Sequence, residues 1–464
     1  MRRRPARHVT FDIQRLNLMF KKILIANRGE IAVRVIYACR ELGIPTVAVY
    51  SEADKHALHV RFADEEICIG PARPLESYLN VPAIITAAEV TGADAIHPGY
   101  GFLSESGYLG EATEACGITF IGPPPAVLRL IGNKTEARRA MKQAGLAVLP
   151  GTEEPPETLS LALKAARKLG YPLILKATAG GGGRGMWIVR RPEELENAWK
   201  TAKQEAAVSF GDGSVYLEKY IEAPRHIEFQ ILADHHGQVV HLGERECSIQ
   251  RRHQKLVEEC PSTVLTERQR RKLGRLVTSA AASVGYRNAG TFEFLMDHEG
   301  RFFFLEANAR LQVEHPVTEM VTGVDIVKEQ IRIAAGQRLS FQQKDVSWRG
   351  HALECRINAE SPETFRPSPG VVKVFCVPGG PGVRLDTAVH TDCTIPPYYD
   401  SLVAKVIAHG IDRAEAVSRM RRTLGMTVIE GIETTVPVHL KILADPDFQN
   451  GELSTAFMDR FAAV

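Results

Sequence analysis

The sequence lacks the features that mark several classes of protein. It contains no apolar run of about 18 residues, so no membrane-spanning helix is predicted. Its eight cysteines form no C-x-x-C pair, which argues against a zinc site or a disulfide framework and indicates reduced thiols in a cytoplasmic protein. The net charge is only +2, so charge-driven binding to nucleic acid is not expected.

Two glycine-rich nucleotide motifs are also absent. No G-x-G-x-x-G follows the first predicted strand, and G-x-x-x-x-G-K-[ST] does not occur in the chain. The sequence therefore supports neither a dinucleotide fingerprint nor a P-loop.

What the sequence does contain is typical of a multidomain globular protein. Its 464 residues are too many for one hydrophobic core, so two or three domains are expected. Residues 1–18 carry five arginines against one acid and are followed by no apolar signal segment, so we expect a basic, disordered extension. An organelle transit peptide and a true start at Met19 are the alternatives.

The first part of the chain alternates between strand and helix patterns. KILIAN and TVAVYS are typical of strands, and the segment between them has helically spaced apolar residues at Ile31, Val35, Cys39 and Leu42. This order predicts an α/β domain with a parallel sheet.

Proline-rich stretches indicate where this first domain ends. GPPPAV at 122–127 and PGTEEPPETLS at 150–160 predict a boundary near 130 and a separately packed piece from about 149 to 221. Strand and helix patterns then alternate to 348, and a third region runs to about 460.

A glycine-rich loop lies inside the separately packed piece. PLILKATAGGGGRGMWIV is predicted to form two strands joined by a run of glycines. Glycines let backbone N–H groups approach an anion closely, and Lys176 at the end of the first strand can meet a phosphate charge. We expect a flap over a triphosphate; a flexible hairpin without a ligand is the alternative.

The register of one hairpin predicts a pair of opposed acids. GTFEFLMDHEGRFFFLEAN has two aromatic-rich runs around the dipeptide at 299–300, which suits a two-residue turn. With this turn, Asp297 faces Phe302. Glu293 then faces Glu306 directly.

The two opposed carboxylates would repel each other unless a cation lies between them. Mg²⁺ prefers carboxylate oxygens together with nucleotide phosphates, so Glu293 and Glu306 are predicted metal ligands. Asn308 projects to the same face and can add an oxygen. The alternative is a solvent-facing polar edge, against which the four neighbouring phenylalanines indicate burial.

Polar residues continue at every second position after the hairpin. If the chain stays extended, Arg310, Gln312 and Glu314 lie on the same face as the predicted metal ligands. The arginine fork suits an oxyanion such as bicarbonate or phosphate, and the carboxylate beyond it can act as a general base.

Eight motifs spread over the chain form a further pattern. They are IANRGEIA, HPGYGFLSE, KATAGGGGRGM, EKYIEAPRHIEFQ, CSIQRRHQK, GTFEFL, ARLQVEHPVTEM and ECRINAE. In combination they resemble biotin carboxylase, the ATP-grasp component of biotin-dependent carboxylases. The resemblance covers residues 19 to about 460.

The resemblance implies a multidomain α/β and α+β fold. Its parts would be the basic extension at 1–18, a pre-ATP-grasp α/β domain at 19–132, an ATP-grasp domain at 133–348 and a C-terminal biotin carboxylase domain at 349–464. A mobile glycine-rich lid, at about 149–221, would belong to the ATP-grasp domain.

The resemblance also implies roles for individual residues. Those expected to bind ATP are Lys134, Lys176, Gly181, Gly182, Gly183, Glu218, Lys219, Tyr220, Ile221, His226, Gln250, His253, Glu293 and Glu306. Those expected to bind bicarbonate are Lys255, Arg310, Gln312, Val313 and Glu314. Those expected to hold Mg²⁺ or Mn²⁺ are Glu293, Glu306 and Asn308, and those expected on the biotin side are Tyr100, Gly101 and Arg356.

The implied reaction has two steps, with Lys255, Arg310, Glu314 and Arg356 as the catalytic residues. Glu314 would deprotonate bicarbonate, which attacks the γ-phosphate of ATP to give carboxyphosphate and ADP. Carboxyphosphate would then release CO₂ to biotin, whose enolate Arg356 would stabilise.

The implied partners are a biotin carboxyl carrier protein, carboxyltransferase subunits and a second copy of the chain. Acetyl-CoA is the expected final acceptor, and pyruvate, propionyl-CoA and 2-oxoglutarate are the alternatives. A different ATP-grasp ligase and a non-catalytic nucleotide-binding relative are two further interpretations.

Four positions depart from the family pattern. Asn133 stands where an aspartate is frequent, Ala179 where a further glycine is frequent, Ser106 where an asparagine is frequent, and Ala307 where a methionine is frequent. None removes a charged catalytic group, so we expect them to affect rate more than reaction type.

Overall fold

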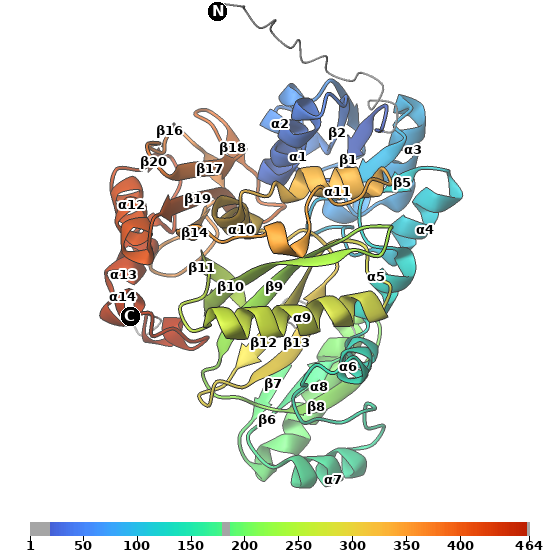
Figure 1. Cartoon of the computed structure of the whole chain (residues 1–464), viewed down its shortest axis with the longest axis vertical. Coiled ribbons are helices and arrows are strands. Elements are labelled where there is room, and N and C mark those ends of the chain that lie inside the picture. Colours follow the sequence, from blue (N-terminus) through green and yellow to red (C-terminus); the bar gives the residue numbers. More distant parts are fainter. Residues whose placement is uncertain (1–18, 179–185, 462–464) are drawn as a thin grey trace, which may run out of the picture.

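The computed structural model describes residues 19–178 and 186–461 (Figure 1). The predicted extension at 1–18 and the glycines predicted to close over ATP, Gly181 to Gly183, lie outside the described residues. The described chain forms a parallel sheet, a small antiparallel sheet and a large antiparallel sheet that joins the centre of the molecule to its C-terminal part.

The N-terminal part is the predicted α/β domain. Its five strands are all parallel, in the order β3-β2-β1-β4-β5. The strands are β1 (Ile23–Ile25), β2 (Thr46–Tyr50), β3 (Glu65–Cys68), β4 (Ala95–His97) and β5 (Thr119–Phe120). The helices are α1 (Gly29–Glu41), α2 (Leu58–Phe62), α3 (Val81–Thr91) and α4 (Gly107–Ala115).

Helix α1 has the apolar face that its sequence predicts. Ile31, Val35 and Cys39 are buried in one core cluster with β1 and α11 (Ile326–Ala334). Burial of such a face on a sheet, more than intrinsic propensity, stabilises a helix of this length.

A small sheet with its own core follows the helices α5 (Pro125–Gly132) and α6 (Lys134–Gln143). It has the order β7-β6-β8 and lies at the bottom of Figure 1. Its elements are α7 (Leu159–Leu169), β6 (Leu173–Ala177), β7 (Met186–Val189), α8 (Leu195–Phe210) and β8 (Val215–Lys219). The strands β6 and β7 are antiparallel, as expected for two strands on either side of the glycine run.

The large sheet has eight strands in the order β13-β12-β9-β10-β11-β14-β19-β17. They are β9 (Arg225–Ala233), β10 (Val239–Arg251), β11 (Gln254–Cys260), β12 (Asn288–Met296), β13 (Phe302–Asn308), β14 (His351–Asn358), β17 (Val383–Thr387) and β19 (Leu402–Gly410). Strand β11 pairs with β14, so one sheet crosses the predicted division at 348/349. The site described below lies on this sheet.

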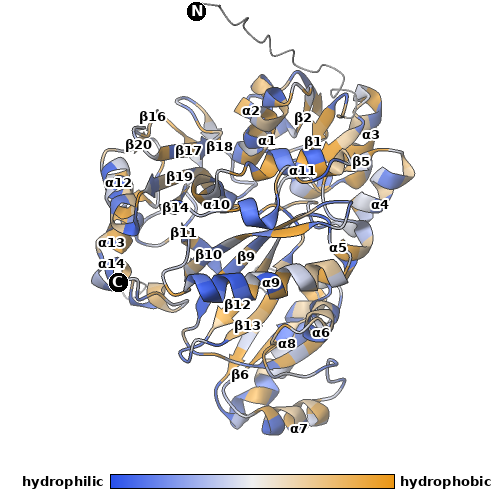
Figure 2. Ribbon diagram, in the orientation of Figure 1, coloured by the Kyte–Doolittle hydropathy of each residue, from blue (hydrophilic) through white to orange (hydrophobic). Residues whose placement is uncertain are grey.

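Helix α9 (Glu267–Ser283) packs on the large sheet, and α10 (His315–Thr322) follows its edge hairpin. The first half of α9 is hydrophilic (Figure 2), whereas Gly274, Val277 and Ala281 are buried against the sheet. A Cβ at Gly274 would lie 2.3 Å from His241 Nε2, so glycine permits this close approach.

The C-terminal part completes the structure. Its helices are α12 (Arg413–Gly425), α13 (Val436–Ala444) and α14 (Pro446–Asn450), and its short strands are β15 (Gly370–Val371), β16 (Val374–Cys376), β18 (Thr394–Ile395) and β20 (Val428–Glu430). Among the described helices, none is long and apolar enough to span a membrane.

Candidate active site

The β12–β13 hairpin places two carboxylates opposite each other. Glu293 pairs with Glu306, so the predicted register of the acids is confirmed. The predicted turn is wrong, because Met296 and not Asp297 faces Phe302.

The hairpin has a longer loop and a compensating bulge. The loop covers residues 297–301, because the Asp297 carboxylate accepts hydrogen bonds from the backbone N–H groups of Glu299 at 3.0 Å and Arg301 at 2.9 Å. A register shift between Glu293 and Phe294 then moves the pairing by one residue. The two departures cancel, so the acids still meet.

A row of charged residues continues across the neighbouring strands. Glu293 also faces Glu228 on β9, and Glu228 faces Arg245 on β10. Directly paired residues project to the same side of a sheet, so these side chains share one face with Glu306. Glu228 and Arg245 are not among the residues predicted from the sequence, although the alternating polar residues of HIEFQ signal a polar face there.

Lys255 lies at the centre of this row. Its Nζ is 2.6 Å from Glu228 Oε2, 3.1 Å from Glu293 Oε1 and 2.6 Å from Glu314 Oε1. An ammonium group has three N–H donors, so each carboxylate accepts one of them. Burial alone would lower the pKa of Lys255, but the three carboxylates hold that pKa well above its ordinary value.

Arg245 fixes Glu228 from the other side and is completely buried. Its Nε donates to Glu228, and its Nη1 donates to Gln230 Oε1 at 2.8 Å and to Thr318 Oγ1 at 3.0 Å. With five donors in a rigid fork, Arg245 orients Glu228 toward Lys255.

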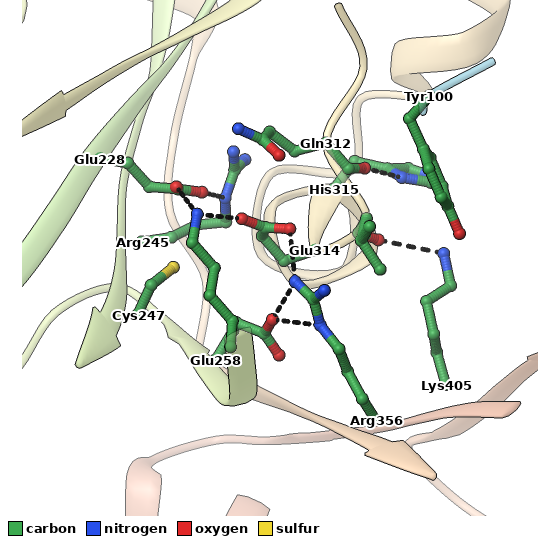
Figure 3. A network of polar contacts seen from close by, with 12 residues as sticks. Tyr100, Glu228, Arg245, Cys247, Glu258, Gln312, Glu314, His315, Arg356 and Lys405 are labelled. Carbon is green, nitrogen blue, oxygen red and sulfur yellow. Dashed lines mark hydrogen bonds and ion pairs between the residues drawn. The ribbon is translucent and has the colours of Figure 1, made fainter. Parts of the chain in front are cut away.

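The Glu314 carboxylate is held between two cations (Figure 3). Lys255 Nζ donates to its Oε1 at 2.6 Å, and Arg356 Nη2 donates to its Oε2 at 2.8 Å. Burial would raise the pKa of Glu314, but the charges of Lys255 and Arg356 lower it well below its ordinary value. Glu314 is therefore ionised at neutral pH.

Arg356 is held in turn by a second buried carboxyl group. Its Nε donates to Glu258 Oε1 at 2.6 Å, and Glu258 faces Glu354 directly across β11 and β14. Burial raises the pKa of Glu258 to about 7, and burial with the neighbouring Glu258 charge raises the pKa of Glu354 well above its ordinary value. The raised pKa favours the protonated form of Glu354, which limits the repulsion between these two side chains.

The chain does not stay extended after β13, so the predicted continuous face is not formed. The strand ends at Asn308, and Glu314 is already the N-cap residue of α10. The side chains converge through a turn instead: Arg310 Nη1 donates to Gln312 Oε1 at 2.8 Å, and Gln312 Nε2 donates to Glu293 Oε1 at 3.0 Å. A proline in the first turn of α10 favours a helix at this point over a longer strand.

Glu105 of the HPGYGFLSE motif anchors this turn from the N-terminal domain. Its Oε2 accepts from Arg310 Nε at 3.0 Å, and its Oε1 accepts from the backbone N–H of Ala309 at 3.2 Å. Arg310 also donates from Nη2 to Asn308 Oδ1 at 3.0 Å. The guanidinium is thus fixed on three sides at the end of β13.

The opposed acids fit a hard divalent cation. Glu306 is half-buried, and its Oε2 lies 4.0 Å from Lys134 Nζ, beyond hydrogen-bonding distance. Burial would raise the pKa of Glu293, but Lys255 and His226 lower it, so Glu293 is ionised. Carboxylate and amide oxygens from Glu293, Glu306 and Asn308 are the donors that Mg²⁺ or Mn²⁺ prefers.

Two further groups of ligand atoms lie close together among the described residues, one at His226, Glu228 and Glu293 and one at Glu228, Cys247 and Glu314. Lys255 pairs with all three of the acids in these groups. Its ammonium group thus supplies the positive charge that a metal would otherwise supply there.

The residues predicted to contact ATP phosphates lie near the opposed acids. Lys134 is the first residue of α6, and Lys176 on β6 donates to Glu218 Oε2 at 2.6 Å. His253, which is predicted to hold adenosine, lies in the tight β10–β11 turn with φ of 65°. Burial, and then the positive charges of Lys176 and Lys134, lower the pKa of His253.

The residues predicted to hold adenosine form a second group. Gln250 Nε2 donates to His226 Nδ1 at 2.7 Å, and His226 Nε2 is 2.8 Å from Glu293 Oε2. Lys219 Nζ donates to the carbonyl of Tyr171 at 2.9 Å, and residues 220–221 form the link from β8 to β9.

The residues predicted on the biotin side follow β4. Tyr100 donates its hydroxyl to Glu30, and Gly101 has a φ of 68°. Figure 3 shows Tyr100 beside Lys405, whose Nζ donates to the carbonyl of Val313 at 3.0 Å. The loop that carries Tyr100 and Gly101 therefore lies close to the turn that precedes the predicted base.

Three of the four departures from the family pattern have a structural explanation. Ser106 caps α4, where its Oγ accepts from the N–H of Leu109 at 3.1 Å. Asn133 caps α6, where its Oδ1 accepts from the N–H groups of Thr135 and Glu136. Ala307 pairs with Phe292, and both are buried in the hydrophobic core, so the face of the acids is unaltered. Ala179 lies outside the described residues.

Comparisons with known proteins agree with this arrangement. Residues 19–128 match the family described as biotin carboxylase, N-terminal domain; 133–342 match the ATP-binding domain of the carbamoyl-phosphate synthase L chain; 354–460 match the biotin carboxylase C-terminal domain.

Three relatives illustrate the similarity. Biotin carboxylase 1 of Bacillus subtilis is 55% identical over 96% of this chain and 99% of its own length. A component of the pyruvate carboxylase of Methanothermobacter thermautotrophicus is 53% identical over 96% of this chain and 90% of its own length. The biotin carboxylase domain dimer of Hydrogenobacter thermophilus 2-oxoglutarate carboxylase, solved with MgADP, ADP and bicarbonate, superposes with a TM-score of 0.93 at 51% identity, covering 95% of this chain and 98% of that one.

Replacing Lys255 with methionine tests the electrostatic balance of the site. The variant removes the cation that Glu228, Glu293 and Glu314 share, and loss of one partner of a buried ion pair costs about 3 to 5 kcal/mol of unfolding free energy. Urea unfolding should show this loss, and Lys272→Met on the exposed face of α9 should lie within about 0.5 kcal/mol of the wild type.

The loss should also depend on pH. Without Lys255 the buried carboxyls have pKa values above their unfolded values, so their contribution to stability is present at low pH and falls as the pH rises. The deficit relative to wild type should therefore be larger at about pH 8 than at about pH 5.5. A deficit as small as that of Lys272→Met, or one that does not change with pH, would contradict the charge balance described.

Proposed function

This chain belongs to the biotin carboxylase family of ATP-grasp ligases, and we propose that it uses ATP and bicarbonate to carboxylate biotin on a carrier protein. The observation that carries the proposal is the contact of Glu314 with both Lys255 and Arg356. One carboxylate thus touches a lysine beside the opposed acids and the arginine predicted on the biotin side. Two successive reactions can share this residue.

The nucleotide binds on the side of the opposed acids. Lys134 and Lys176 contact its phosphates, and His226, Gln250, His253 and residues 218–221 contact its adenosine. Glu293, Glu306 and Asn308 would hold Mg²⁺ or Mn²⁺, which would supply positive charge to neutralise the phosphates.

Bicarbonate binds between Lys255 and Arg310, close to Gln312 and the backbone of Val313. In the free protein, all three N–H groups of Lys255 donate to carboxylates. Bound bicarbonate therefore replaces at least one of these carboxylates as a partner of Lys255. Sharing Lys255 with a second anion weakens its hold on Glu314 and raises the pKa of that carboxyl. Glu314 then becomes a better base for the bicarbonate proton.

The first step joins a bicarbonate oxygen to the γ-phosphorus while the bond from that phosphorus to the bridging oxygen of ADP breaks. The products are carboxyphosphate and ADP. Positioning and charge neutralisation supply most of the catalysis of such transfers.

In the second step carboxyphosphate releases CO₂, and the phosphate that remains takes the N1 proton of biotin. The biotin nitrogen then attacks CO₂. Arg356 stabilises the negative charge on the biotin enolate, and Tyr100 with Gly101 lines the biotin side.

We further propose a biotin carboxyl carrier protein, carboxyltransferase subunits and a second copy of this chain as partners. The dimer is supported by the Hydrogenobacter thermophilus relative, which is described as a dimer. The finer proposal is that the complex is an acetyl-CoA carboxylase. Identity alone does not favour it, because the pyruvate carboxylase relative is as similar to this chain as a relative named biotin carboxylase, each at 53% identity.

Replacing Glu314 with glutamine tests the assignment of the base. The wild type should cleave ATP in a bicarbonate-dependent manner that free biotin stimulates, and the variant should lose about 10²- to 10⁴-fold of this rate because a general base contributes that much. Calorimetric titration should show unchanged ATP affinity.

The matched control is Glu299→Gln in the exposed hairpin loop, which should keep wild-type rates. Turnover of the Glu314 variant within twofold of wild type would refute the assignment of the base. ATP cleavage by the wild type that ignores bicarbonate would refute the function.

Reconstitution of this chain with its carrier protein and carboxyltransferase partners tests which final acceptor is carboxylated. Carboxyl transfer from ¹⁴C-bicarbonate to acetyl-CoA is the expected result. If the carboxyl group is transferred to pyruvate, propionyl-CoA or 2-oxoglutarate and not to acetyl-CoA, the complex is the carboxylase of that acceptor and the acetyl-CoA carboxylase assignment is wrong.

A further inference from the structure

The loop at residues 98–104, here named the biotin-side loop, joins β4 to α4 with an unusual backbone. Gly99, Gly101 and Phe102 have positive φ values of 63°, 68° and 41°. A non-glycine residue in this region is strained, and such strain persists only where neighbouring groups hold the backbone. Tyr100 and Gly101, which are predicted to line the biotin side, belong to this loop. The residues that hold its backbone therefore bear on biotin binding.

Asn27 of the IANRGEIA motif provides one anchor. Its Nδ2 donates to the carbonyl of Pro98 at 2.7 Å and to the carbonyl of Tyr100 at 2.8 Å. Its Oδ1 accepts from the backbone N–H of Arg28 at 2.8 Å, so the orientation of the amide is fixed by its own chain. The side chain is 2% exposed, and both of its amide protons are therefore used in a dry environment.

The loop approaches Asn27 so closely that only glycine fits between the two carbonyls. A Cβ at Gly99 would lie 2.9 Å from Asn27 Nδ2 and 3.1 Å from Ile31 Cγ1. Gly99 also donates its N–H to His97 Nδ1 at 3.0 Å. The amide of Asn27 and the glycine opposite it thus form one fitted contact.

Glu30, one turn further along the motif, provides the second anchor. It accepts the hydroxyl of Tyr100, and its Oε1 lies 3.2 Å from Lys405 Nζ. Lys405 in turn donates to the carbonyl of Val313, the residue before the predicted base. The start of α1 therefore connects the ring of Tyr100 with the turn that carries Glu314.

We propose that Asn27, with Glu30 as its second anchor, is a positioning residue that holds Tyr100 and Gly101 where biotin must bind. The inference rests on the proposed function and goes beyond it, because Asn27 touches neither the nucleotide-side residues nor the predicted bicarbonate residues. Its effect is confined to the biotin half of the site. Bicarbonate-dependent ATP cleavage without biotin does not need it.

Replacing Asn27 with aspartate tests this role with little change of shape. The new oxygen faces two carbonyl oxygens and repels the loop, while the bond from the N–H of Arg28 is kept. The KM for free biotin should rise about tenfold, as expected when two buried hydrogen bonds to the loop are lost. The rate of ATP cleavage with bicarbonate and without biotin should stay within about twofold of wild type.

Asn80→Asp is the matched control in the same domain. Asn80 caps α3 by accepting from the N–H of Ala83, and aspartate caps helices equally well. This variant should leave the KM for biotin unchanged.

Gly99→Ala disturbs the same contact from the loop side and should give the same split between biotin-dependent and biotin-independent rates. The double variant with Asn27→Asp should be no worse than the more affected single variant, because both remove one interaction. Strictly additive effects would contradict the proposal.

An unchanged KM for biotin in Asn27→Asp, or an equal fall of both rates together with a lower melting temperature, would show that Asn27 only supports the fold. Failure of the proposed function is a separate outcome: the wild type itself would then show no bicarbonate-dependent cleavage of ATP.

Discussion

Three buried carboxylates share the ammonium group of Lys255, and the rest of the site depends on this contact. Glu228, Glu293 and Glu314 come from β9, from β12 and from the start of α10, and each lies 2.6 to 3.1 Å from the same nitrogen. Without a shared cation, their mutual repulsion in a medium of low dielectric constant would separate the elements that carry them. The ammonium group of Lys255 removes this repulsion, so the edge hairpin, the central strands and α10 meet at this residue.

The same contact explains how a site built for anions remains stable in the free protein. Lys255, Arg310 and Arg356 are each held by acidic side chains that accept their hydrogen bonds. An incoming anion exchanges with these acids, so the cations are oriented in advance and little reorganisation is needed. Arg356 on β14 donates to Glu258 on β11, so the network of ion pairs crosses the β11–β14 pairing.

The sequence predicts the parts of the site that depend on local periodicity. Alternation in β12 and β13 predicts the Glu293–Glu306 pair even though the turn is longer than expected, because a bulge restores the register. Contacts between strands far apart in the sequence are not predictable in this way. Glu228 meets Lys255 across 27 residues, and Glu258 meets Glu354 only because β11 pairs with β14. The turn after Asn308 depends on Glu105, a residue of another domain, so an extended chain was the simpler expectation.

The central claim is that this balanced cluster presents bicarbonate, and not water, to the γ-phosphorus of ATP. Turnover in ¹⁸O-labelled bicarbonate with unlabelled water tests this most directly, by mass spectrometry of the inorganic phosphate at early times. If bicarbonate is the nucleophile, one labelled oxygen should appear in each phosphate released. Phosphate without label, or label that appears only when the water is labelled, would contradict the account.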